Sequence, residues 1–270
     1  MRPHYAHAAR RLASAALVAV LALSLGGCKT PGNSDTTGSI GSPAAPRSDA
    51  EWRQQAEHWG TRYRANPGDA EAAMRYAQAL RATAQRAQAA AVLEQATIGN
   101  PQNKALLGAY GRALADIGSY GQALEVLGRA HTPDQPDWRI LSAQGAVLDQ
   151  MGRHADAQRH YASALKMAPN DPSVLSNLGL SYALSKDLKR GEATLRRAVG
   201  QPGADSKARQ NLALVVGLQG RFPEAEAIAR ADLPPDEAAA NVAYLRQMLS
   251  EENERKKLGR AGKQGPRAGT

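Results

Sequence analysis

Hydrophobic positions recur with a fixed period along most of this chain. From Ala70 onward the pattern repeats every 34 residues without an insertion, and five units begin at Ala70, Lys104, Trp138, Pro172 and Ser206. Small residues stand at the eighth and twentieth positions of every unit: Ala77, Gly111, Gly145, Gly179 and Ala213, then Ala89, Ala123, Ala157, Gly191 and Ala225. Larger apolar residues fill the eleventh positions. This pattern predicts two helices per unit that cross at their small side chains.

Glycine and proline mark the turns between these helices. Gly118, Gly152 and Gly220 share the fifteenth position, where the first helix of a unit needs a residue in the left-handed conformation to end it. Pro101 and Pro169 close two of the units. A helix–turn–helix unit of 34 residues resembles the tetratricopeptide repeat (TPR). The resemblance implies an all-α TPR solenoid, which is a right-handed superhelix, with five repeats over residues 70–237.

Both ends of the array differ from the repeats, as is typical of capping helices. Residues 49–69 predict an aromatic-rich helix in the place of a preceding second helix. The fifth repeat departs from the pattern with Arg209 at its fourth position and Asp232 at its 27th, so we interpret its second helix as degenerate. Residues 238–257 predict a C-terminal capping helix, with apolar residues on one face and charged residues on the other.

The amino terminus has the pattern of an export signal. Basic residues precede Leu12–Leu25, an apolar run that is too short to cross a hydrocarbon core of about 30 Å. Leu25–Cys28 resembles the lipobox of bacterial lipoproteins, and Cys28 is the only cysteine of the chain. We therefore expect a signal peptide over residues 1–27 and lipidation of Cys28. An ordinary signal peptide with an incidental cysteine is the other interpretation.

The lipoprotein resemblance also implies a location. Lys29 follows the cysteine in place of the aspartate that retains many lipoproteins in the inner membrane. The periplasmic face of the outer membrane is therefore the expected place of anchoring. Two or more acyl chains on Cys28 would give stable attachment where a single chain does not. Residues 28–48 are rich in Pro, Gly, Ser and Thr, and they predict a flexible tether that spans roughly 25 Å.

The net charge of +9 does not indicate a nucleic-acid-binding protein. Nine of the 34 cations lie in residues 1–27 and 255–270, which contain no acids. The other 25 cations equal the 25 acids, so residues 28–254 are neutral. Residues 258–270 predict a disordered basic tail, which could also contact phosphates, lipid headgroups or an acidic partner.

No motif for catalysis or cofactor binding is present in the sequence. The four histidines beyond the signal peptide show no metal-ligand spacing: His58, His131, His154 and His160. Phosphate-binding loops and nucleophile elbows are absent as well. We expect a protein that is not an enzyme and that uses no cofactor, metal or small-molecule substrate. A hidden active site would require a deep cleft with converging titratable groups.

The first helices of the repeats are expected to line a concave groove that binds a peptide. The repeat positions that face such a groove supply the candidate binding residues: Met74, Gln78, Arg81, Arg112, Asp116, Arg139, Ser142, Asp149, Ser176, Asn177, Leu180, Lys207, Gln210, Asn211 and Leu214. Asn177 and Asn211 share the sixth position of successive repeats, and for them both ligand binding and a role in the fold are open. The groove becomes more apolar toward its C-terminal end.

Longer stretches narrow the resemblance to one family. These stretches are Trp138–Gly145 (WRILSAQG), Ser176–Lys186 (SNLGLSYALSK), Asn211–Arg221 (NLALVVGLQGR) and Ala231–Ser250. They resemble the TadD-type TPR lipoproteins of the tight-adherence (Flp) pilus assembly system. The resemblance implies a pilotin-like assembly factor whose partner is the pilus secretin or another Tad component, with membrane contact through Cys28. The alternative is a general periplasmic TPR lipoprotein scaffold that recruits cell-wall hydrolases or proteases.

Overall fold

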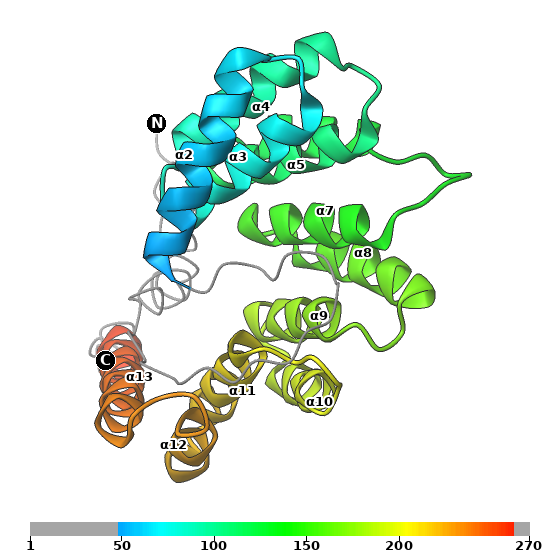
Figure 1. Cartoon of the computed structure of the whole chain (residues 1–270). Helices are drawn as coiled ribbons and strands as arrows, with labels where there is room; N and C mark the ends of the chain where they lie inside the picture. Colours follow the sequence, from blue (N-terminus) through cyan, green and yellow to red (C-terminus); the bar gives the residue numbers. More distant parts are fainter. Residues whose placement is uncertain (1–47, 262–270) are drawn as a thin grey trace, which may run out of the picture. The chain divides into compact units, whose positions relative to one another are not determined.

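A computed structural model describes residues 48–261, which form twelve helices and no strand (Figure 1). In chain order these are α2 (Asp49–Ala65), α3 (Ala70–Ala82), α4 (Arg86–Gly99), α5 (Lys104–Asp116), α6 (Tyr120–Arg129), α7 (Trp138–Gln150), α8 (His154–Met167), α9 (Pro172–Leu184), α10 (Leu188–Val199), α11 (Ser206–Leu218), α12 (Phe222–Ala229) and α13 (Pro235–Ala261). The expected signal peptide, Cys28, the tether up to residue 47 and the tail from residue 262 lie outside the described residues.

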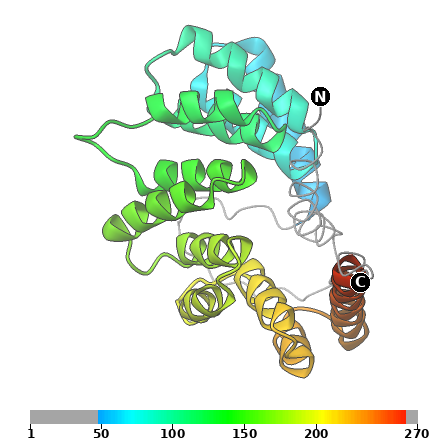
Figure 2. The same cartoon turned by 180° about the vertical axis from the view of Figure 1, so that it is seen from behind.

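The described residues divide into two compact units. The first unit holds residues 48–136 and the turn Gln150–Gly152, and the second holds Asp137–Asp149 and residues 153–261. Helix α2 and the pairs α3–α4 and α5–α6 make up the first unit (Figures 1 and 2). The pairs α7–α8, α9–α10 and α11–α12 lie in the second unit and are followed by α13. Each pair coincides with one of the five predicted repeats.

The same kind of cap begins every first helix. A carboxylate or amide residue directly precedes each of these helices at intervals of 34 residues: Asp69, Asn103, Asp137, Asp171 and Asp205. Each of these side chains accepts a hydrogen bond from a backbone N–H of the first turn. The caps satisfy donors that the start of a helix leaves open, so each repeat begins at a defined residue.

The small residues lie where the two helices of a repeat cross, as the sequence predicts. A Cβ added to Gly145 would lie 2.7 Å from the ring of Tyr161. A Cβ added to Gly191 would lie 2.9 Å from the carbonyl oxygen of Gly179, so α9 and α10 approach each other through their backbones. Large apolar side chains such as Leu195 are fully buried beside these crossings. Close helix approach, rather than large aromatic rings, therefore makes the core.

The turn inside every repeat uses the left-handed conformation at the fifteenth position. Gly118, Gly152 and Gly220 have φ values of +81°, +74° and +82°, which confirms the prediction for these glycines. Ala84 and Lys186 stand at the same position with φ values of +62° and +70°. A side chain in this conformation costs roughly 1–2 kcal/mol. The first and fourth repeats therefore hold a strained residue where the others hold glycine.

Two departures from the pattern in the fifth repeat compensate each other. Arg209 donates hydrogen bonds from Nε and Nη2 to the two carboxylate oxygens of Asp232, at 2.7 and 2.5 Å. Only 30% of the Arg209 side chain and 11% of the Asp232 side chain are exposed. Other repeats place alanine or leucine at these two positions. The second helix of this repeat, α12, has only eight residues, in agreement with a degenerate unit.

An ion-pair network joins the fourth and fifth repeats. Glu192 on α10 accepts hydrogen bonds from Arg221, from Gln219 at 2.8 Å and from Arg196 at 2.9 Å. Arg196 also pairs with Glu224 at 2.6 Å. The hydrogen bond from Arg221, aided by those from Gln219 and Arg196, lowers the pKa of Glu192 to about 2. The carboxylate therefore stays ionised across the physiological range.

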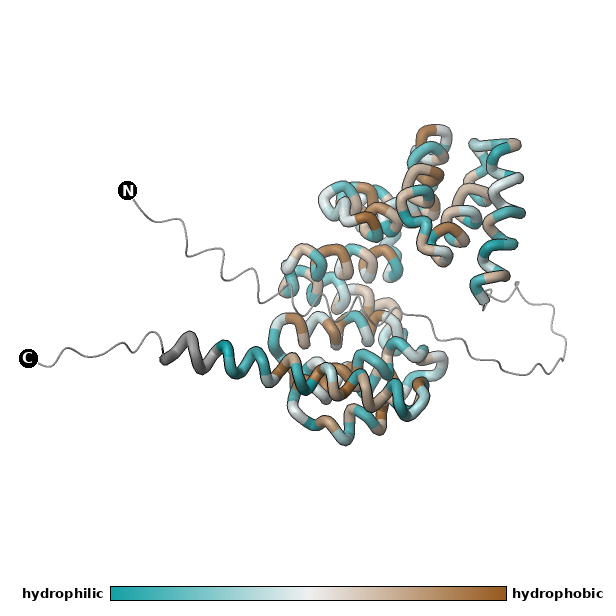
Figure 3. Tube along the Cα trace, turned by 90° about the vertical axis from the view of Figure 1, so that its left-hand side faces the viewer, coloured by the Kyte–Doolittle hydropathy of each residue, from teal (hydrophilic) through white to brown (hydrophobic). Residues whose placement is uncertain are grey.

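The two terminal helices differ in character (Figure 3). Helix α2 begins with a capping box between Ser48 and Glu51, packs against α3 and is hydrophilic along much of its length. Helix α13 starts three residues before the expected range 238–257 and ends four residues after it. Residues 258–261, expected in the basic tail, thus continue the helix. Proline in the first turn and basic residues near the end favour this longer helix.

Candidate protein-binding surface

In the first unit, the predicted groove residues lie on α3 and α5. Arg81 on α3 and Asp116 on α5 form an ion pair with each other. Gln78 is exposed, and Met74 and Arg112 are half-buried. This ion pair links α3 and α5, the first helices of neighbouring repeats. The side chains of Met74 and Gln78 remain accessible beside this ion pair.

In the second unit, the predicted groove asparagines bond to serines of the preceding repeat. Nδ2 of Asn177 donates to Oγ of Ser142 at 3.3 Å, and Nδ2 of Asn211 donates to Oγ of Ser176 at 3.0 Å. Ser142, Ser176 and Asn211 are buried. With Asn177, these side chains hold α7, α9 and α11 together. Contrary to the expectation, Ser142 and Ser176 are buried and not open to a ligand, and Asn211, for which both roles were open, bonds within the fold. Asn177 is half-buried.

Asp149, another predicted groove residue, is the centre of a polar cluster that joins the third and fourth repeats. Its carboxylate accepts hydrogen bonds from Oγ of Ser181 at 2.8 Å and from the hydroxyl of Tyr161 at 3.1 Å, and Nδ1 of His154 lies 2.8 Å away. Only 8% of the Asp149 side chain is exposed. Burial raises the pKa of this carboxyl above its usual range, against the opposing effect of its three partners. Asp149 thus links α7, α8 and α9.

The cluster around Asp149 contains a serine, a histidine and an aspartate, but not in the order that nucleophilic catalysis requires. Catalysis of that kind needs the serine hydroxyl to donate to the histidine, which the aspartate orients. Here Ser181 donates directly to Asp149. The sequence holds one sign of this cluster, because Tyr161 replaces leucine at the 24th position and a buried tyrosine hydroxyl needs a partner.

The remaining predicted residues of the second unit are accessible. Arg139 and Lys207 are exposed at the first turns of α7 and α11, and the Arg139 guanidinium lies 4.3 Å from the ring centroid of Trp138. Gln210, Leu180 and Leu214 are half-buried on α9 and α11. This part of the surface combines cations, an amide and leucines. Such a surface suits an extended or helical segment of a protein partner.

Comparisons with known proteins agree with this architecture. Residues 142–208 match the family described as tetratricopeptide repeat, and residues 53–130 match the family of anaphase-promoting complex (cyclosome) subunit 3. The fold is a TPR solenoid. The sequence matches none of the curated proteins.

Several solved structures share this TPR fold. A TPR protein from Parabacteroides merdae aligns with a TM-score of 0.64 at 10% identity, over 72% of this chain and 78% of that one. PilW, described as a widely conserved type IV pilus biogenesis factor, aligns with a TM-score of 0.61 at 16% identity, over 72% and 91%. A thermophilic TPR protein from Thermus thermophilus aligns with a TM-score of 0.58 at 22% identity, over 66% and 99%. At these identities the likeness shows the fold alone.

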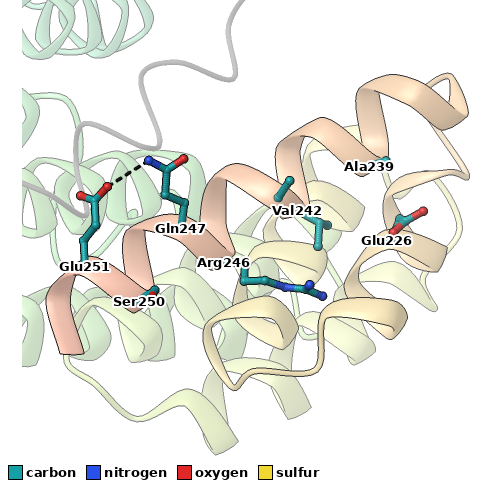
Figure 4. A pocket seen from close by; sticks show the side chains of 8 residues that line it. Glu226, Ala239, Val242, Arg246, Gln247, Ser250 and Glu251 are labelled. Carbon is teal, nitrogen blue, oxygen red and sulfur yellow. Dashed lines mark hydrogen bonds between the residues drawn. The ribbon is translucent and has the colours of Figure 1, made fainter. Parts of the chain in front are cut away.

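A second surface feature of the TPR array is a shallow hollow between α12 and α13 (Figure 4). Its volume is about 490 Å³, and Glu226, Val242, Arg246 and Glu251 are among its lining residues. The charged groups are spread along the helices, and each contacts a neighbour. Arg246 lies 4.7 Å from the ring centroid of Phe222, Glu226 pairs with Arg230 at 2.5 Å, and Glu251 accepts from Gln247 at 3.0 Å.

Within residues 48–255, no three His, Cys, Asp or Glu side chains come together as a metal site. In the same part of the chain, no helix combines the length and the apolar character that crossing a bilayer requires. Cys28, the predicted lipidation site, lies outside the described residues.

Proposed function

We propose that this chain is a non-catalytic scaffold, anchored by a lipid on Cys28 to the periplasmic face of the outer membrane. There it acts as a pilotin-like assembly factor for the secretin of a tight-adherence (Flp) pilus. The observation that carries the proposal is the accessible surface of the first helices. Leucines, an amide and two cations are accessible there, beside buried residues that hold the helices together. A TPR array of this kind holds protein partners.

Two further observations support the pilus assignment. The lipobox around Cys28 provides a way to hold the array at the outer membrane, where secretins assemble. The stretches that resemble TadD-type lipoproteins contribute residues of α9 and α11 to the accessible surface, including Leu180 and Leu214. A fold-level likeness to a type IV pilus biogenesis factor is consistent with this role, but fold alone does not define function.

The proposal is tested in a strain from which this gene is deleted and then restored as the wild type or as Cys28→Ala. We expect secretin multimers in the outer-membrane fraction of the wild type, and their loss or displacement in the deletion strain. Cys28→Ala should release the protein from the membrane fraction and reproduce the deletion defect, because the array then no longer reaches its place of action. Immunoblots of separated inner and outer membranes measure both effects.

Unchanged secretin multimers in the deletion strain would contradict the pilotin role. If cell-wall hydrolases or proteases then co-purify with the chain, the result would favour the general scaffold instead. A Cys28→Ala protein that stays in the outer membrane would contradict the lipid anchor, whatever the partner.

A further inference from the structure

Six apolar side chains lie on one side of three neighbouring helices in the second unit, α9, α11 and α13. We call them the apolar strip: Leu180, Leu184, Leu214, Leu218, Tyr244 and Met248. Five of them are half-buried, and Tyr244 is 49% exposed. The strip is therefore a surface rather than a part of the core.

Helix α13 continues the strip because it follows the register of the repeats. Met248 stands 34 residues after Leu214, which stands 34 residues after Leu180. Leu245 is buried over Gly217 of α11, so this side of α13 packs on the fifth repeat. At 100° per residue, Tyr244 and Met248 lie on one side of that packed face, and Arg246 lies on the other side, toward α12.

The composition of α13 differs from that of a helix that only solvates the end of an array. Such a terminal helix is polar on its outer side, as α2 is, with Arg53, Glu57 and Arg64 exposed. Arg246 is the one charged residue of α13 between residues 238 and 250, and Tyr244 is exposed in this stretch. Figure 3 shows the same change along α13, from mixed and hydrophobic residues to hydrophilic ones. The first half of α13 thus continues the apolar strip.

Lysines flank the strip on both sides. Lys207 is exposed at the start of α11, Lys186 is exposed in the turn after α9, and Lys189 is exposed in the first turn of α10. None of these three forms an ion pair within the described residues. The acids beside them serve other partners, since Asp205 caps α11 and Asp187 caps α10 and pairs with Arg190.

A hollow lies at the edge of the strip where two of these lysines stand. It is shallow, measures about 620 Å³ and is lined by Lys186, Lys189, Gln219 and Asp187, among others. Gln219 directly follows Leu218, and Ser185, which also lines the hollow, directly follows Leu184. Helices α9 and α11 of the strip therefore end beside a hollow that holds two lysines and one carboxylate, Asp187, which caps α10 and pairs with Arg190. This hollow suits an acidic group of a partner.

We infer that the second unit binds an acidic amphipathic segment of its protein partner. The apolar side of the segment lies on the apolar strip, and its carboxylates lie beside Lys186, Lys189 and Lys207. This inference rests on the proposed function as a scaffold and names the chemistry of the partner. Three neighbouring helices at spacings of 8–10 Å give a strip on the order of 20 Å long, which about 13 residues of an α-helix span.

The experiment measures binding of two designed helical peptides with the same leucine face. One peptide carries glutamate beside the leucines, and the other carries lysine. The protein is the full chain with Cys28→Ala, and fluorescence anisotropy of the labelled peptide gives the Kd. We expect the glutamate peptide to bind at least about tenfold tighter than the lysine peptide, with a difference that shrinks as salt is added.

Matched variants locate the binding surface. Leu214→Glu and Met248→Glu, tested separately, should each weaken binding of the glutamate peptide about tenfold or more, because each places a charge within the apolar strip. The control is Ile98→Glu on α4, where the isoleucine is 71% exposed and lies outside the strip. Binding by the control should stay within about twofold of the parent, and circular dichroism of each variant checks that the helices form.

Charge reversal tests the lysines in the same assay. Lys189→Glu combined with Lys207→Glu should weaken binding of the glutamate peptide about fivefold, and Lys166→Glu on α8 should not. Equal binding of both peptides, absence of binding by the glutamate peptide, or full binding by Leu214→Glu and Met248→Glu would each overturn the inference. Peptide selectivity without any secretin defect in the deletion strain would support binding at the strip and contradict the pilus role. A secretin defect without peptide selectivity would support the pilus role and contradict binding at the strip.

Discussion

Replacing Gly191 with alanine should destabilise the fourth repeat, although alanine stands at the same position in the other four repeats. A Cβ on Gly191 would lie 2.9 Å from the carbonyl oxygen of Gly179 and 3.3 Å from the backbone nitrogen of Ala183. Both atoms belong to the backbone of α9, so neither can turn aside as the end of a flexible side chain can. Helices α9 and α10 must therefore move apart to accept the methyl group.

Two opposing effects set the magnitude of this change. Alanine is more favourable than glycine in a helix by about 1 kcal/mol, and overpacking of a close contact costs about 1–3 kcal/mol. Because the contact at Gly191 is with backbone, we place the cost in the upper part of that range. The expected net loss in the free energy of unfolding is about 1–2 kcal/mol.

Gly128→Ala is the matched control for this substitution. Gly128 lies in α6, and a Cβ at this position would have no atom within 4 Å. The control therefore keeps the gain in helix propensity without the clash, and it should stabilise the protein by about 0.5–1 kcal/mol. Urea denaturation followed by circular dichroism gives the stabilities, and hydrogen exchange shows whether the loss falls on α9 and α10. A Gly191→Ala protein as stable as the parent would refute the backbone contact between these helices.

Three further substitutions test other features of the fold. Lys186→Gly should raise the free energy of unfolding by about 0.5–1 kcal/mol in urea, since it removes a side chain from a left-handed turn; no gain would argue against strain at φ +70°. Alanine substitutions of Arg209 and Asp232 should each cost about 1–3 kcal/mol, and the double variant should cost clearly less than their sum; additive losses would show that the two side chains are not coupled. Glu192→Gln should cost about 1 kcal/mol at pH 7, because the folded-state pKa of about 2 lies below the ordinary value of 4.5. Stability from this carboxylate is present above that ordinary value and is lost as the pH falls toward 2, so parent and variant should converge in acid; a difference that does not depend on pH would contradict the ion-pair network.

The helix pairs could be predicted because the signals for them are local and repeated. Small residues at Gly145 and Ala157 follow from the space available at a helix crossing, and Gly152 follows from the geometry of the turn after it. Lys186 stands at the same fifteenth position, but its residue type gave no such signal, since lysine does not favour the left-handed conformation. There the packing of the two helices imposes the conformation on whichever residue stands at that position.

The polar contacts within and between repeats were the part that the sequence did not reveal. Arg209 and Asp232 are 23 residues apart, and each residue alone is only a departure from the repeat pattern. Asn211 occupies a groove position by its place in the repeat, but whether its amide meets a ligand or a serine of the preceding repeat depends on the distance between the helices. Asp149 likewise acquires its three partners only when α7, α8 and α9 come together.

The buried Asn–Ser hydrogen bonds between first helices also bear on how the second unit opens. In a linear repeat array, the cooperativity of unfolding depends on how strongly nearest neighbours are coupled. If the repeat that holds Asn211 opens alone, its hydrogen bond to Ser176 of the neighbouring repeat is lost, which costs about 0.5–1.5 kcal/mol. Fraying of a single repeat is thereby suppressed. Amide hydrogens from α7 to α11 should accordingly exchange with solvent in one concerted event, and a partner bound to α11 would protect amides two repeats away that it never touches.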